Sequence, residues 1–102
     1  MALKNTRQGS SLIVHLSGEL DHHSAARVRQ EMDRLLKDAA IKELILDMKG
    51  LEFMDSSGIG LLMGRYRTLS KRGGRICVRN LSGQVQRVFR ASGLYRIIDM
   101  EA

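Results

Sequence analysis

Residues 44–69 read LILDMKGLEFMDSSGIGLLMGRYRTL, and this stretch holds the pattern that decides the fold. It begins with Leu44–Met48, a nearly continuous apolar run that is typical of a strand buried on both faces. It ends with apolar residues at helical spacing: Ile59, Leu62, Met63, Tyr66 and Leu69. That spacing predicts an amphipathic helix. A buried strand followed by such a helix is the unit of sheets with parallel strands, so we expect an α/β fold.

Upstream of this stretch, the sequence predicts a hairpin and a helix. Residues 12–16 form a short apolar run rich in β-forming side chains, and a weaker strand over residues 3–8 joins it through a glycine-containing turn. Residues 25–39 then change to helical periodicity, with charged side chains on the other face. Either Asp21 or Ser24 is placed to cap this helix.

Downstream, the alternation of strands and helices continues. We expect a strand over residues 75–79, a helix that begins at Ser82 and ends at Gly93, and a last short strand that begins at residues 97–98. The expected order is therefore ββαβαβαβ. We expect a single domain over residues 1–102, with a mixed, mostly parallel sheet and the helices packed against it.

Composition narrows the class of protein. The chain has 102 residues, of which 43% are apolar, and no apolar run approaches the roughly 20 residues of a membrane span. The first residues are polar, so no signal peptide is recognisable. Cys77 is the one cysteine, which excludes an internal disulfide framework and fits a reducing compartment. We therefore expect a soluble, cytoplasmic protein.

The net charge of +6 is concentrated in the second half of the chain. No acidic residue lies between Asp55 and Asp99, whereas lysines and arginines recur from Arg65 onward. Such a surplus is typical either of a solvated basic face or of a surface for an anionic partner, such as nucleic acid, a membrane or an acidic protein. The segment has no nucleic-acid motif and no run of aromatic residues for base stacking.

Two polar segments follow predicted strands: Gly18–Ser24 (GELDHHS) and Phe53–Gly60 (FMDSSGIG). The carboxyl ends of parallel neighbouring strands meet at one edge of a sheet, so we expect the two segments to lie close together. The second segment also begins a helix, where Asp55 or Ser56 is expected as an N-cap and where free N–H groups can hold an anion.

The same segments permit a hydrolase interpretation. In it, the nucleophile is Ser56 or Ser57 and the base is His22 or His23. The acid that orients the base is Asp21 or Asp55. The Gly-x-Ser-x-Gly spacing of a nucleophile elbow is absent, and so is any spacing typical of metal ligands. We therefore expect no catalytic residue, no metal and no cofactor.

Residues 16–25 and 51–60, followed by Gly64–Tyr66, resemble the STAS-domain anti-sigma factor antagonists, and most closely those of the sporulation type. Residues 91–94 and 97–98 resemble the C-terminal segment of that family. The resemblance implies a STAS-type α/β domain. Sporulation-type members commonly continue into another helix, so it also implies that this helix is absent or truncated here.

The resemblance further implies a non-enzymatic regulator with its phosphorylation site at Ser56. The unphosphorylated form would bind an anti-sigma factor that is also a serine kinase and so release the sigma factor, and a serine phosphatase would reverse the modification. The implied partner-binding residues are Glu19, Asp21, Asp55, Ser56, Ser57 and Gly58. We expect a monomer when the chain is free, with no direct contact to nucleic acid or membrane. The alternative is a nucleotide- or anion-sensing STAS domain that uses the N–H groups of residues 56–60.

Overall fold

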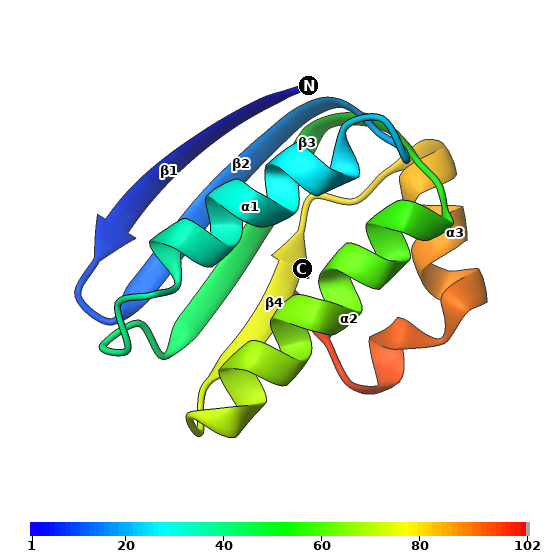
Figure 1. Ribbon diagram of the computed structural model, residues 1–102. Coiled ribbons are helices and arrows are strands. Elements are labelled where there is room, and N and C mark those ends of the chain that lie inside the picture. The colour runs from blue at the N-terminus through cyan, green and yellow to red at the C-terminus, as the bar shows by residue number, and fades with distance from the viewer. Residues whose placement is uncertain (102) are drawn as a thin grey trace.

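The computed structural model describes residues 1–101 and arranges them around a five-stranded sheet (Figure 1). The strands lie side by side in chain order, with the first pair antiparallel and the other pairs parallel. Their bounds are Ala2–Gln8 for β1, Ser11–Leu20 for β2, Glu43–Met54 for β3, Arg75–Arg79 for β4 and Asp99–Glu101 for β5. The predicted mixed, mostly parallel sheet is confirmed.

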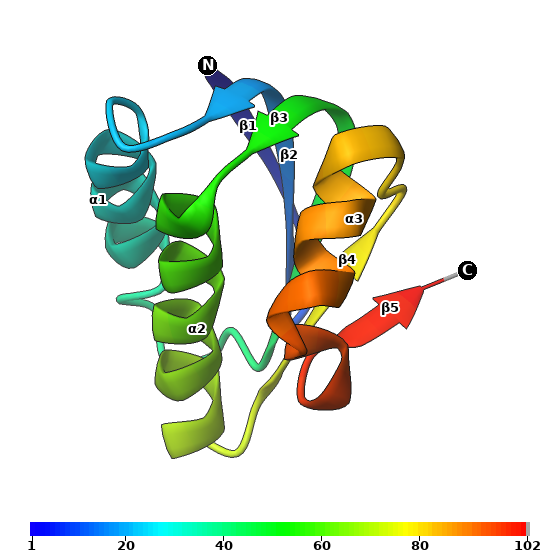
Figure 2. The ribbon, with the colours of Figure 1, turned by 90° about the vertical axis from the view of Figure 1, so that its right-hand side faces the viewer.

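Three α-helices connect the parallel strands. They are α1 (Ala25–Leu35), α2 (Ser56–Lys71) and α3 (Gly83–Ser92), and a short 3-10 turn, η1 (Leu94–Arg96), follows α3. Figures 1 and 2 show α1 and α2 next to each other on one side of the sheet. The third helix, α3, joins the same hydrophobic core through Val85 and Phe89. The alternation of helices and strands that the sequence predicts is therefore confirmed.

Every second side chain of the central strands points into this core. In β2 the side chains of Leu12, Val14 and Leu16 are buried and belong to the core, and β3 and β4 contribute alternate residues in the same way. Met32 of α1 and Leu62 of α2 are completely buried against them. Truncating a side chain of this kind to alanine costs about 2–5 kcal/mol in typical cores.

The structure corrects the ends of two predicted strands. The buried strand does not end at Met48 but continues as β3 to Met54, with β-bulges in its pairing to β2. The predicted last strand is present, but its predicted start at Ile97 and Ile98 is wrong. Ile98 is fully buried, and its N–H donates to the carbonyl of Leu94 (2.8 Å), so its hydrophobicity serves the core behind η1. Sheet pairing begins one residue later, at β5.

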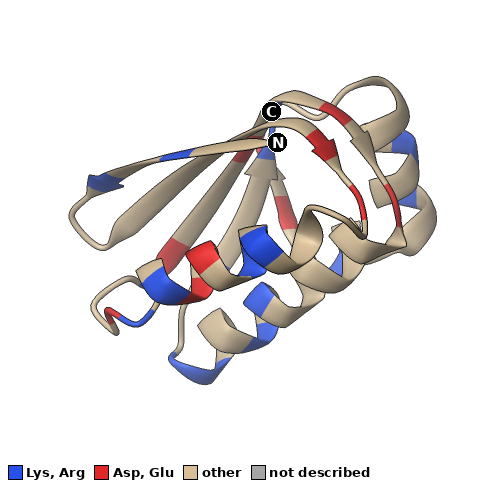
Figure 3. Cartoon of the chain, turned by 45° about the horizontal axis from the view of Figure 1, so that its top comes forward, with Lys and Arg blue, Asp and Glu red and all other residues tan. Residues whose placement is uncertain are grey.

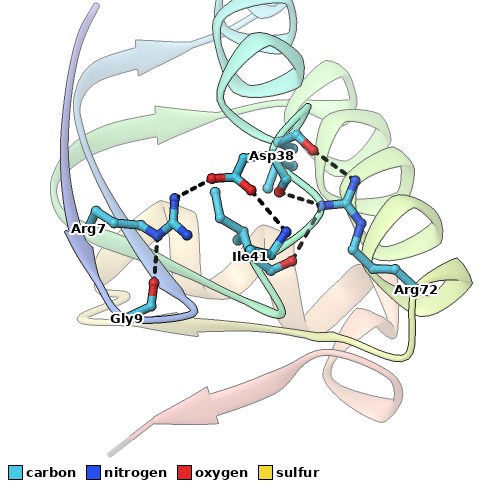
Figure 4. Close-up of polar contacts among 7 residues, drawn as sticks. Arg7, Gly9, Asp38, Ile41 and Arg72 are labelled. Atoms are coloured by element: carbon cyan, nitrogen blue, oxygen red, sulfur yellow. Dashed lines mark hydrogen bonds and ion pairs between the residues drawn. The ribbon is translucent and has the colours of Figure 1, made fainter.

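Arg72 accounts for part of the basic surplus of the second half. Its guanidinium donates to the carbonyls of Leu36 (2.8 Å), Asp38 (3.2 Å) and Ile41 (3.3 Å), which lie after the end of α1 (Figure 4). Carbonyls at a helix end lack intrahelical partners, so the cation both caps α1 and connects it to α2. Arg7 of β1 donates to the Asp38 carboxylate (2.8 Å) in the same cluster.

Other cations of the second half also pair within the chain. Arg75 lies between the carboxylates of Glu43 (2.6 Å) and Asp99 (2.8 Å), and so connects β4 to the strands on either side. Arg79 donates to Asp47 (3.2 Å). These arginines are therefore structural, and the net charge of the second half overstates the surface available to an anionic partner.

Candidate functional site

The ends of β2 and β3 bring the two polar segments together, as the sequence predicts. Leu20 lies opposite Met54 in the last register pair of the two parallel strands. The N–H of Asp55 donates to the carbonyl of Leu20 (3.2 Å), which carries the pairing one residue beyond β3. The segment that contains Asp21 and the segment that contains Ser56 consequently leave the sheet at the same edge.

Asp55 caps α2 and sets the position of the serines. Its backbone is extended, its carboxylate Oδ1 accepts the N–H of Ser57 (2.8 Å), and its carbonyl accepts the N–H of Gly58 (3.0 Å). Ser56 is the first residue of the helix and is exposed, and its hydroxyl makes no hydrogen bond within residues 1–101. The structure therefore presents the Ser56 hydroxyl to solvent on a fixed backbone, whereas Ser57 is half-buried.

Gly58 allows α2 to begin close against the strand ends. It is buried, and a Cβ at this position would lie 2.3 Å from Cγ of Met54 and 3.1 Å from Cδ2 of Leu20. Real Cβ atoms do not approach other atoms so closely, so a side chain here would displace either Met54 or the helix. The glycine is thus a structural requirement of the turn that positions Ser56.

Gln84 also positions this turn, and the sequence analysis did not identify it. Its Nε2 donates to the carbonyl of Met54 (2.8 Å) and its Oε1 accepts the N–H of Met54 (3.0 Å). The next strand, β4, pairs with β3 only as far as Asp47, so the amide of Gln84 takes the place of a strand at the end of β3. The sequence shows a polar residue in the first turn of α3, but no local pattern reveals its distant target.

Asp21 organises the turn between β2 and α1. Its Oδ1 accepts the N–H groups of His23 (2.9 Å) and Ser24 (3.1 Å). These hydrogen bonds lower the pKa of the Asp21 carboxyl below its ordinary value, and the N–H of Ser24 contributes most to that shift. Ser24 donates its hydroxyl to the carbonyl of Glu19 (2.8 Å) and makes no cap with its side chain. Of the two predicted capping residues, Asp21 is therefore the one whose carboxylate accepts N–H groups at this turn.

The surroundings of these turns are acidic although the chain is basic. Glu19, Asp21 and Glu52 line a surface hollow of about 560 Å³, and His23 and Arg27 contribute to its wall. Figure 3 shows acidic positions on the segments that lead out of β2 and β3, and mostly basic positions along the helices, with acidic ones also on α1. A partner that covers this edge of the sheet therefore meets mostly negative charge.

The structure does not assemble the elements of the hydrolase interpretation. The rings of His22 and His23 lie against each other, with centroids 4.0 Å apart, and both residues are exposed. Within residues 1–101 no hydrogen bond joins Ser56 or Ser57 to either imidazole, and Asp21 binds backbone N–H groups instead of a ring. The described part of the chain, residues 1–101, contains no cluster of three or more side chains that is suited to a metal ion. No helix within it is long and apolar enough to span a bilayer.

Comparison with protein families gives a match over almost the whole chain. The model described as "STAS domain" matches residues 2–102. Among curated proteins, the anti-sigma F factor antagonist of Paenibacillus polymyxa is 42% identical over 87 residues, which cover 85% of this chain and 74% of that protein. The anti-sigma-B factor antagonist of Bacillus subtilis is 35% identical over 89 residues, which cover 87% of this chain and 80% of that protein.

Solved structures give the same result. The anti-sigma factor antagonist SpoIIAA in its unphosphorylated form matches with a TM-score of 0.86 and 33% identity, over 99% of this chain and 89% of that one. The phosphorylated form of SpoIIAA, described as a Bacillus cell fate determinant, matches with a TM-score of 0.77 and 32% identity, over 99% of this chain and 92% of that one.

Proposed function

Because the chain belongs to the STAS domain family and, within it, to the anti-sigma factor antagonists, we propose that it acts by partner switching controlled at Ser56. The unphosphorylated chain binds an anti-sigma factor that is also a serine kinase, and the sigma factor is released. The kinase transfers the γ-phosphoryl group of ATP to the Ser56 hydroxyl, which ends the binding, and a serine phosphatase restores it. The observation that carries this proposal is the exposed Ser56 hydroxyl at the start of α2.

The charge around Ser56 supports a switch of this kind. Phosphorylation adds about −1.5 to −2 charges at neutral pH. The N-terminus of α2 favours the added anion, whereas Asp55 and the acidic residues of the neighbouring turn oppose it. Placing like charge in an interface costs several kcal/mol, and about 1.4 kcal/mol already changes an affinity tenfold. Phosphorylation can therefore change binding without any rearrangement of the fold.

The comparison structures agree with this reasoning. SpoIIAA was solved in both forms, and each matches the present fold over 99% of this chain. These two matches support a switch that acts through the contact surface and leaves the fold intact.

The proposed contact surface contains Glu19, Asp21, Asp55, Ser56, Ser57 and Gly58. The ionised Asp21 is held by its own turn and is available to a cationic side chain of the partner. Asp55 and Gly58 act by fixing the start of α2. We place the protein in the cytoplasm as a monomer when free, and the lone Cys77, which is buried and unpaired, suits a reducing compartment.

A phosphorylation assay tests the proposal. The chain is incubated with ATP and the anti-sigma F factor of Paenibacillus polymyxa, the protein that the name of the 42% identical relative specifies. Phosphopeptide mass spectrometry should then find the phosphate on Ser56. The control variant Ser57→Ala should be modified like the wild type, and Ser56→Ala should remain unmodified. Phosphate on a different residue, or none on the wild-type chain, would refute the assignment.

A further inference from the structure

A groove between α1 and α2 adjoins the proposed contact surface. It has a volume of about 360 Å³, and its lining residues are Ala25, Ala26, Arg29, Ser57, Gly60 and Leu61. Most of these residues are small, and a Cβ built on Gly60 would meet no other atom within 4 Å. The groove is therefore open from the first turn of α2, next to Ser56, down between the two helices.

Arg65 lies one helical turn beyond the residues that line this groove. On α2 it follows Leu61 by one helical turn, and it faces Asp33 of α1, which follows Arg29 by one turn. The Arg65 side chain is only 8% exposed, and Asp33 Oδ1 lies 3.2 Å from its Nε. That contact does not have hydrogen-bond geometry, and within residues 1–101 neither Nε nor Nη1 of Arg65 has an acceptor.

A buried guanidinium without acceptors is unusual. Arginine carries five N–H donors and keeps its charge in proteins, and burying such a cation is costly unless carboxylates or carbonyls accept those donors. Burial lowers the pKa of Arg65 below its ordinary value, Asp33 offsets part of that effect, and the nearby charge of Arg29 lowers the pKa further. Asp33 is thus the one carboxylate in contact with Arg65 among the described residues, and it is itself 47% exposed. Arg29 on the groove wall and Arg65 one turn beyond it therefore outnumber Asp33 by one charge, and Nε and Nη1 of Arg65 have no acceptor among the described residues.

Resting on the function proposed above, we infer that this groove receives a carboxylate side chain, Asp or Glu, from the anti-sigma factor. The carboxylate accepts hydrogen bonds from Arg29 and Arg65 and supplies the missing negative charge. A planar carboxylate matches the fork of a guanidinium, and the small residues of the walls leave space for the stem of the side chain. The partner then presents basic groups to the acidic turns and one acidic group to the groove, a pattern that fixes the orientation of docking.

Affinity measurements with single variants test this inference. Isothermal titration calorimetry with the anti-sigma F factor of Paenibacillus polymyxa compares the wild-type chain with Arg29→Ala and Asp33→Asn. We expect Arg29→Ala to weaken binding about tenfold or more, because the ion pair between Arg29 and the carboxylate of the anti-sigma factor is lost. We expect Asp33→Asn to tighten binding several-fold, because Asp33 no longer competes for Arg65. If the Arg65–Asp33 ion pair had a purely structural role, breaking it would not increase the affinity.

Arg34→Ala is the matched control. Arg34 lies on the same helix, its side chain is 62% exposed, and it pairs with Glu31 one turn away. Its removal should leave the affinity unchanged, and circular dichroism should show that all variants are folded.

The outcomes separate this inference from the proposed function. If the wild-type chain does not bind the anti-sigma factor, both are refuted. If the wild type binds and Arg29→Ala binds equally well, the groove inference alone is overturned. It is also overturned if inorganic phosphate or ATP, added to the free chain, shifts the amide signals of Ser57 and Gly60, because the groove would then hold a free phosphate.

Discussion

The side-chain amide of Gln84 binds both backbone polar groups of Met54, accepting its N–H at 3.0 Å and donating to its carbonyl at 2.8 Å. This contact joins α3 to the last residue of β3, two residues before Ser56. The serine is therefore positioned by three elements of the fold, because Asp55 is also bonded to Leu20 of β2.

Removing that amide should loosen the site. Gln84→Ala leaves two partly buried backbone groups of Met54 without partners, so we expect a loss of about 1–3 kcal/mol in the free energy of unfolding. Urea denaturation measures the loss, and hydrogen exchange should accelerate at the Met54 amide. Gln86→Ala, on the same helix, is the control and should change neither. Unchanged exchange at Met54 in Gln84→Ala would contradict the positioning role.

Two glycines of α2 should respond in opposite ways to substitution by alanine. At Gly58 the new Cβ would lie 2.3 Å from Met54 Cγ, so we expect destabilisation by about 1–3 kcal/mol. At Gly60 nothing lies within 4 Å, so the better helix propensity of alanine should stabilise the chain by about 0.5–1 kcal/mol. Denaturation of both variants checks the difference, and equal effects would show that the close packing at Gly58 has no energetic consequence.

Much of this arrangement can be read from the sequence. The periodicities over residues 44–69 predict a buried strand and an amphipathic helix, and the polar residues after two parallel strands predict that Asp21 and Ser56 lie near each other. These features are local, or follow from the geometry of parallel strands. The N-cap role of Asp55 is predictable for the same reason.

The contacts that were missed join residues distant in sequence. Gln84 and Met54 are 30 positions apart, and Arg72 reaches carbonyls 31 to 36 positions away. Nothing in the local pattern distinguishes Arg72 from a solvated arginine, so the sequence alone does not show which cations of the second half bind within the chain. The start of the last strand was predicted too early because two isoleucines have the same pattern in a turn as in a short strand, and here only Ile98 is buried whereas Ile97 is exposed.

The bridging role of Arg72 leads to a test of its own. Arg72→Ala removes three hydrogen bonds to carbonyls beyond the end of α1, so we expect a loss of about 1–3 kcal/mol of stability. Arg67 is exposed on α2, the helix that Arg72 directly follows, and Arg67→Ala should cost less than about 0.5 kcal/mol. Thermal unfolding compares the two variants. Equal melting temperatures of the two variants would mean that the hydrogen bonds of Arg72 do not contribute to stability.

Asp47 should make the stability of the chain sensitive to acid. Its side chain is 10% exposed and accepts hydrogen bonds from Asn80 (3.0 Å), the N–H of Lys49 (3.0 Å) and Arg79 (3.2 Å). Burial works to raise the pKa of this carboxyl, but these donors outweigh it, and the pKa lies below the ordinary value of 3.8.

The sign of the effect follows from that lowered pKa. The contribution of the Asp47 carboxylate is complete above the unfolded-state pKa of about 3.9 and is lost as the pH falls through the folded-state value. Asp47→Asn should therefore destabilise the chain by about 1–3 kcal/mol at pH 7, and the difference from wild type should shrink below about pH 4. Urea denaturation across this range measures it, with the exposed Glu52→Gln as control. A difference that does not change with pH would refute the assignment.

The most direct test of the switch compares the affinities of the unphosphorylated chain and of the chain phosphorylated at Ser56 for the anti-sigma F factor of Paenibacillus polymyxa. The charge argument predicts that the phosphorylated form binds at least about tenfold more weakly, which corresponds to about 1.4 kcal/mol or more. Both forms should have the same circular dichroism spectrum, because the fold does not change. Equal affinities for the two forms would contradict the proposal that phosphorylation of Ser56 controls binding.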